Sequence, residues 1–142
     1  VSAVDKNNAW AVGHGFVFIH TTDGGATWKN QSFYKKGFDF DANDVWGVND
    51  RTAWAVTDND GIYYTTDSGD KWHKQSYQVH GGPFFLMGVC ALDASTAWAV
   101  GSNESGRDQL GIILHTSDGG VTWREQKMPV SAMMLNVSFV KP

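Results

Sequence analysis

Three aspartates, Asp23, Asp67 and Asp118, recur in nearly identical surroundings. Carboxyl groups are the usual catalytic groups of glycosidases, in which two of them face one another across the bound sugar. A catalytic carboxylate is needed once in a protein, whereas each of these three is followed by the same run of small and polar residues. The repetition therefore favours a structural role, in which each aspartate accepts hydrogen bonds from backbone N–H groups of its own turn.

The other groups that could do chemistry form no recognisable constellation. The five histidines make no His-x-x-x-His pair or Cys/His cluster of the kind that holds zinc. No Ser/His/Asp arrangement and no phosphate-binding glycine loop is evident. The sequence therefore predicts a protein that is not an enzyme, with no catalytic residue, no metal site and no cofactor.

The aspartates belong to a longer repeat. The segment Ala-Trp-Ala-Val occurs three times, with tryptophans 44 residues apart at Trp10, Trp54 and Trp98. The aspartate segments end at tryptophans 28, 72 and 123, and the longer second interval reflects an insertion within 101–111. Repeats of roughly 40–50 residues are typical of propellers and solenoids.

Each repeat is expected to form four short strands joined by hairpin turns. In the second copy the expected strands are 45–48, 53–57, 62–66 and 71–75, separated by Asn-, Asp- and Gly-rich turns. A lone four-stranded sheet has two faces to cover, and radial stacking of such sheets covers both. The sequence predicts an all-β chain of three four-stranded antiparallel propeller blades, at 1–41, 42–86 and 87–134, followed by the first strand of a fourth at 135–142.

The pattern Thr-x-Asp-x-Gly-x-Thr-Trp resembles the Asp-box, also called the bacterial neuraminidase repeat. Copies one and three match it fully, and copy two departs only at Lys71, where threonine is usual. The resemblance implies a β-propeller with these motifs between the third and fourth strands of each blade. Its structural residues are the aspartates, the glycines that permit positive φ and the tryptophan anchors: Asp23, Gly25, Trp28, Asp67, Gly69, Trp72, Asp118, Gly120 and Trp123.

The pairing of Ala-Trp-Ala-Val with this motif is also similar to the photosystem II assembly and stability factor family, which implies a non-enzymatic propeller. Sialidases and some glycosidases share the motif. The three arginines that a sialidase site brings together are not matched by Arg51, Arg107 and Arg124, which lie in separate segments. Because one fold serves many functions, function has to be argued from a site.

The segments between blades are long and rich in aromatic residues, which suit contact with a protein or a sugar. Packing between the blades is the alternative role, and Tyr34, Tyr77 and Phe85 are the residues we expect to be exposed. His20 and His115 share a repeat position with Tyr64, which indicates a structural role. The candidate binding residues are Tyr34, Lys35, Lys36, Phe38, Tyr77, His80, Phe84, Phe85 and Arg107.

The composition and net charge of the chain limit the classes of molecule that it is expected to bind. A net charge of −4 and a pI near 5.6 argue against nucleic acid, and no apolar run approaches the roughly 18 residues of a membrane span. The single Cys90 permits no internal disulfide. We expect an extracytoplasmic scaffold whose partner is another protein, or further blades of the same or a second chain. The alternative is a carbohydrate-active domain, either lectin-like or part of a glycosidase. The end of the chain one strand into a fourth repeat favours part of a longer chain over a ring of copies.

Overall fold

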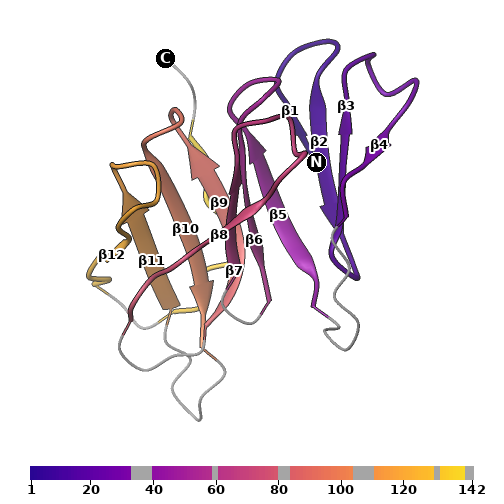
Figure 1. Ribbon diagram of the computed structural model, residues 1–142. Helices are drawn as coiled ribbons and strands as arrows, with labels where there is room; N and C mark the ends of the chain where they lie inside the picture. Colours follow the sequence, from indigo (N-terminus) through magenta and orange to yellow (C-terminus); the bar gives the residue numbers. More distant parts are fainter. Residues whose placement is uncertain (33–39, 59–60, 80–83, 104–110, 130–131, 140–142) are drawn as a thin grey trace.

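The computed structural model describes residues 1–32, 40–58, 61–79, 84–103, 111–129 and 132–139. These residues form twelve strands in three four-stranded antiparallel sheets, and none of them is helical (Figure 1). The predicted all-β fold of three propeller blades is confirmed. Within the described segments, nothing resembles an apolar helix long enough to cross a bilayer.

Each sheet is a meander in which strands consecutive in the chain are hydrogen-bonded neighbours. Blade 1 contains β1 (Ser2–Ala3), β2 (Ala9–Gly13), β3 (Val17–Thr21) and β4 (Lys29–Asn30). Blade 2 contains β5 (Ala42–Gly47), β6 (Ala53–Thr57), β7 (Gly61–Thr65) and β8 (His73–Gln75). Blade 3 contains β9 (Phe85–Ala91), β10 (Ala97–Ser102), β11 (Gly111–Thr116) and β12 (Arg124–Glu125).

The first strand of blade 2 starts at Ala42, earlier than the expected 45–48. Its pairing with β6 shifts between Ala42 and Asp44, so the alternation of apolar and polar residues is interrupted there. Asn43 lies at this irregularity, and its side-chain amide donates to Asp58 Oδ1 and to the carbonyl of Leu86, both at 2.7 Å. Hydrogen-bonded polar residues at such an irregularity interrupt the alternation of apolar and polar residues by which a strand is recognised in a sequence.

The Ala-Trp-Ala-Val segments form the second strand of every blade, and their tryptophans stack on the strand beside them. Trp10 lies 3.8 Å from His20 between ring centroids, and Trp54 lies 4.0 Å from Tyr64. Trp98 lies 4.5 Å from His115. Each pair faces across two antiparallel strands, where side chains on the same face are close enough to pack. His20 and His115 therefore have the structural role that their repeat position indicates.

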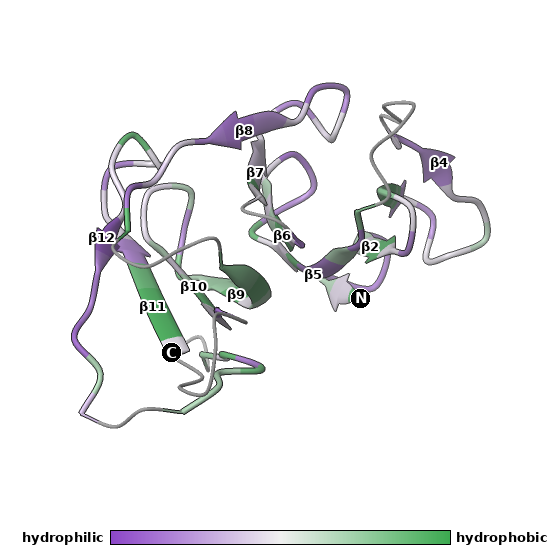
Figure 2. Cartoon of the chain, turned by 90° about the horizontal axis from the view of Figure 1, so that it is seen from below, coloured by the Kyte–Doolittle hydropathy of each residue, from purple (hydrophilic) through white to green (hydrophobic). Residues whose placement is uncertain are grey.

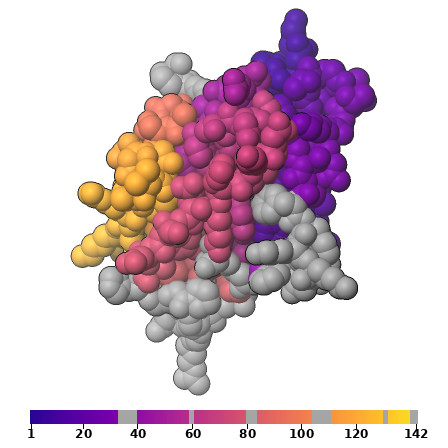
Figure 3. Space-filling model, in the orientation of Figure 1, coloured from indigo at the N-terminus to yellow at the C-terminus, as the bar shows by residue number. Residues whose placement is uncertain are grey.

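The three blades stand side by side, with blade 2 between the other two (Figure 3). Seen along the strands, β4, β8 and β12 fan outwards while β5 and β9 lie closer together (Figure 2). One buried cluster, which includes Trp10, Phe18 and Val45, joins blades 1 and 2. A second cluster, which includes Trp54 and Leu114, joins blades 2 and 3. The hydrophobic core thus lies between the sheets, as it does in a propeller.

The C-terminal segment, residues 132–139, contains no strand, in contrast to the strand expected from 135. It nevertheless runs along the open face of blade 3, where Phe139 lies 4.6 Å from Trp98 between ring centroids. Asn136 passes so close to Gly88 that a Cβ on that glycine would be 2.9 Å from the Asn136 Cα. A strand is defined by pairing with a neighbour, and no described residue pairs with this segment.

Candidate functional site

The three aspartate turns, at 21–28, 65–72 and 116–123, share the same hydrogen bonds except for one hydroxyl donor that blade 2 lacks. In blade 1, Asp23 Oδ1 accepts from the Thr27 backbone N–H at 2.8 Å, and Asp23 Oδ2 accepts from the Thr27 hydroxyl at 2.6 Å. The Thr21 hydroxyl donates to Asp23 Oδ1 at 2.8 Å and accepts from the Gly25 N–H at 2.9 Å. Every bond of the carboxylate thus stays within its own turn.

These bonds favour the ionised carboxylate. The pKa of Asp23 and of Asp118 is lowered to about 2, and the largest cause is the threonine hydroxyl four residues on. The pKa of Asp67 is also lowered, chiefly by the backbone N–H of Lys71. Lys71 stands where the other turns have threonine, so Asp67 accepts from the Thr65 hydroxyl but has no second hydroxyl donor four residues on. An aspartate held ionised by its own turn is poorly placed to act as a general acid.

The tryptophans that end the turns of blades 2 and 3 pack on the preceding blade. Trp72 meets Trp10 edge-on, with ring centroids 5.8 Å apart, and its ring centroid lies 4.8 Å from that of Phe18. Trp123 meets Trp54 in the same way at 5.6 Å. Trp72 and Trp123 are therefore anchors between blades, and the large aromatic surface that they bury stabilises the stacking of the sheets.

A glutamine at or just after the end of the outer strand reaches into the turn of the next blade. The Gln31 amide donates to the Ser68 carbonyl, and a Cβ on Gly69 would lie 2.1 Å from Gln31 Oε1. In the next interface, a Cβ on Gly120 would lie 2.3 Å from Gln75 Oε1. The glycine at this turn position makes room for the neighbouring blade's glutamine, in addition to its positive φ.

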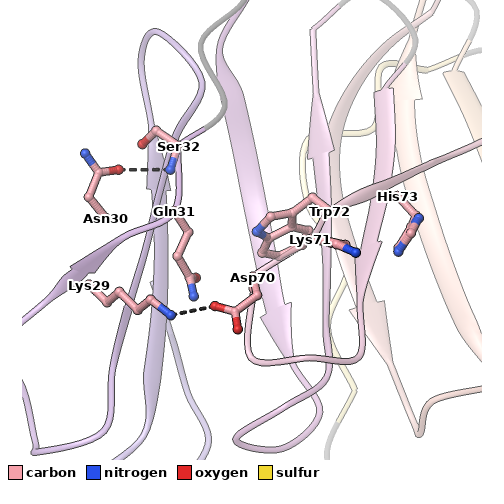
Figure 4. Close-up of a pocket in the computed structure, with 9 residues that line it drawn as sticks. Lys29, Asn30, Gln31, Ser32, Asp70, Lys71, Trp72 and His73 are labelled. Atoms are coloured by element: carbon pink, nitrogen blue, oxygen red, sulfur yellow. Dashed lines mark hydrogen bonds and ion pairs between the residues drawn. The ribbon is translucent and has the colours of Figure 1, made fainter.

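A groove of about 580 Å³ opens between blades 1 and 2 at their outer strands. One wall is formed by residues 29–32, which comprise β4 and the two residues after it. The other wall is formed by residues 69–73, which comprise the end of the blade 2 turn and the start of β8 (Figure 4). Lys29 Nζ bridges the two walls to Asp70 Oδ1 at 2.5 Å. The groove therefore lies beside an aspartate turn and at the edge of two sheets.

The charge of the groove differs from that of the whole chain. Its lining contains two lysines, Lys29 and Lys71, against the single carboxylate of Asp70, although the chain carries a net charge of −4. Asp70 is already paired with Lys29. Lys71 is exposed and makes no salt bridge with any described carboxylate. The arrangement offers a cation to an incoming ligand and no described cluster that could hold a metal ion.

Comparison with known proteins fits this architecture. The family model of the photosynthesis system II assembly factor YCF48 matches residues 1–84, more than half of the chain. The chain belongs to the YCF48 family. The resemblance to the photosystem II assembly factors is thereby confirmed. A search of curated proteins finds none that matches this chain.

A solved structure of YCF48 bound to D1 peptide is similar to this chain with a TM-score of 0.74 and 24% sequence identity. The match covers 94% of this chain and 40% of the YCF48 chain. At this identity the likeness shows the propeller fold. This chain corresponds to well under half of the length of that YCF48.

The candidate residues between the blades are only partly described. Phe84 is 3% exposed and packs in the core between blades 2 and 3, so its ring is not available to a ligand. Tyr77 is half-buried and packs against the same core, and Phe85 is half-buried at the start of β9, in contrast to the exposure expected of both. Tyr34, Lys35, Lys36, Phe38, His80 and Arg107 lie outside the described residues.

Sequence reasoning missed the groove, because it treated the aspartate turns as internal supports only. The signal was present in Gln31, Gln75 and Gln126, each of which lies three residues after the tryptophan of its turn. A polar residue that recurs in every copy outside the turn points to a contact between copies. The groove of this YCF48 family member forms where such a contact leaves Lys29 and Lys71 on either side.

Proposed function

We propose that this chain is a non-enzymatic protein-binding module, and that the groove between blades 1 and 2 receives an extended acidic segment of its partner. The observation that carries the proposal is a cationic groove on an acidic chain. Membership of the YCF48 family supports it, as does the fact that a YCF48 of the same fold has been solved with a peptide bound.

The chemistry of the groove favours a peptide with carboxylates. Lys71 is exposed on one wall, and Lys29 on the other is held only by an exposed ion pair with Asp70. Exposed ion pairs contribute roughly 0–1 kcal/mol, so a ligand carboxylate can exchange with Asp70 at little cost. Open edges of the outer strands β4 and β8 also present backbone groups that an extended segment can pair with.

A selection from a random peptide display library tests this function. We expect the enriched peptides to be acidic, and we expect Lys71→Glu to reduce their affinity about tenfold or more because it reverses the exposed charge. Lys6→Glu changes charge by the same amount in the hairpin before β2, away from the groove, and is the matched control. Enrichment of basic peptides, or equal binding by both variants, would contradict the proposal.

A glycan array and a hydrolysis assay separate a protein partner from a carbohydrate. The described carboxylates on the side of the blade crossovers are engaged within the chain. Asp41 Oδ1 accepts from the Gly15 N–H and pairs with His14, and Asp58 Oδ1 accepts from Asn43. Binding on a glycan array, or release of reducing sugar that Asp41→Asn abolishes, would favour the carbohydrate alternative. An extracytoplasmic location stays a prediction that cell fractionation can test.

A further inference from the structure

Two of the three aspartate turns contain the chemically reactive sequence Asp-Gly, at Asp23-Gly24 and Asp118-Gly119. Because glycine has no side chain, its backbone nitrogen can approach the preceding carboxyl group closely. The nitrogen forms a bond to the aspartate Cγ, and its proton leaves with the carboxyl OH as water, so that a cyclic imide remains. Water then opens the imide at its other carbonyl and gives isoaspartate, in which the side-chain carbons belong to the main chain. The reaction needs no reagent other than water.

The nitrogen that would attack is held by a hydrogen bond in both turns. The Gly119 N–H donates to the Ser95 carbonyl at 2.9 Å, and the Gly24 N–H donates to the Asn7 carbonyl at 2.9 Å. Both carbonyls belong to the hairpin that joins the first and second strands of the same blade. Attack on the carboxyl group removes this N–H proton, so the hydrogen bond has to break first.

The carboxylate that would be attacked is held as well. Asp118 Oδ1 accepts from the Thr122 N–H at 2.9 Å and from the Thr116 hydroxyl at 2.8 Å, and Asp118 Oδ2 accepts from the Thr122 hydroxyl at 2.6 Å. Hydrogen bonds to an ionised group are among the stronger ones. They lower the pKa of Asp118 from 3.8 to about 2, so near neutral pH the carboxyl form that can lose water is about sixtyfold scarcer than at the ordinary pKa.

The turn of blade 2 differs in two respects that belong together. Ser68 follows Asp67 in place of glycine, and its side chain hinders attack by its own nitrogen. Lys71 replaces the threonine four residues after the aspartate, so the second hydroxyl donor is absent. The turn without the reactive Asp-Gly sequence is thus the one without this hydroxyl, whereas both turns that contain Asp-Gly have it.

We propose that Asp118 and Asp23 are sites of isoaspartate formation in this chain, and that the threonine four residues after each aspartate protects it while the turn is closed. The protecting residues are Thr122 and Thr27. The same turn carries Trp123, which packs on Trp54 of blade 2. An additional main-chain carbon at Asp118 therefore disturbs the junction between blades 2 and 3.

Incubation of the full chain in mildly acidic buffer, followed by peptide mapping with an isoaspartyl methyltransferase and mass spectrometry, tests the proposal. In the folded parent chain we expect isoaspartate to form at Asp118 about tenfold or more slowly than in concentrated urea at the same pH, where the turns are open. Thr122→Val should accelerate the reaction at Asp118 about fivefold or more and leave the rate at Asp23 unchanged. Thr27→Val should do the reverse, so each variant is the matched control of the other.

Thr122→Ser separates the hydroxyl from the packing of the side chain, because it retains the donor and should retain the protection. Circular dichroism and thermal melting establish that each variant is folded at the temperature of incubation. Equal rates in the folded parent chain and in urea would overturn the proposal, as would a rate at Asp118 that Thr122→Val leaves unchanged. An equal rise at Asp23 and Asp118 in Thr122→Val would also overturn it, because general unfolding and not the hydroxyl would then control the reaction.

Discussion

Each aspartate turn holds two consecutive residues in the left-handed conformation, which favours glycine at both positions. Blades 1 and 3 have Gly-Gly there, with φ of 72° and 90° for Gly24 and Gly25. Blade 2 places Ser68 at the first position with φ of 62°, which is uncommon for a residue with a side chain. The neighbouring blade's Gln31 donates to the carbonyl of this serine.

The ionised turn aspartates make folding sensitive to acid. Their pKa in the folded chain, about 2 for Asp23 and Asp118, is below the ordinary 3.8. The stabilisation is therefore fully present above pH 3.8 and is lost as the pH falls toward 2. We expect thermal melts to show a midpoint that drops steeply between these pH values, and less steeply in Asp118→Asn.

Thr122→Val provides the control for this acid dependence. It removes the hydroxyl that is the largest cause of the lowered pKa of Asp118 and leaves the backbone N–H donor in place. The pKa of Asp118 in the folded chain then lies closer to 3.8, so the loss of stability in acid should be smaller than in the parent chain and complete at a higher pH. An unchanged acid transition in both variants would show that these hydrogen bonds do not control it.

At the scale of elements, equivalent turns contribute different amounts to the free energy of unfolding in different blades. Trp123→Ala removes a nearly buried ring that packs on Trp54, and we expect it to lower the free energy of unfolding by about 3–5 kcal/mol. Trp28→Ala alters the corresponding turn of blade 1, where the ring is 40% exposed, and should cost about 1 kcal/mol or less. Urea unfolding of dilute protein measures both, and equal losses would contradict the role of Trp123 between blades.

The contrast between these elements shows what could be predicted from sequence. The strands, their order and the turn glycines follow from local patterns such as Ala-Trp-Ala-Val, because alternation and turn chemistry act over a few residues. The partner of Trp123 is Trp54, far away in the chain, and no local pattern specifies that contact. The burial of Phe84 between blades was missed for the same reason.

At the scale of the molecule, only blade 2 has both faces covered by described blades. Every residue of β6 is buried, whereas four of the five residues of β2 are only half-buried. We expect amide hydrogen exchange to be slowest in β6, since exchange there requires separation from both neighbours. Hydrogen-exchange mass spectrometry should show faster exchange in β2, and equal protection of the two strands would contradict this ranking.

The candidate site was less predictable than the fold because it belongs to no single blade. Its walls, at Lys29 and Lys71, come from two blades, and each residue alone looks like an ordinary exposed lysine after or within a turn. The sequence directed attention to the segments between blades, where the described aromatic residues pack inward. Charge contrast across a groove becomes visible only when the blades are placed beside each other.

The glutamine that each blade inserts into the next has a consequence for how such proteins change over generations. Gln31 and Gln75 each enter the aspartate turn of the next blade, so a unit of 44 residues carries half of the contact at either end. Duplication or loss of one whole unit by unequal recombination leaves each remaining junction with both halves. The number of units can therefore drift in a lineage without any junction having to be redesigned.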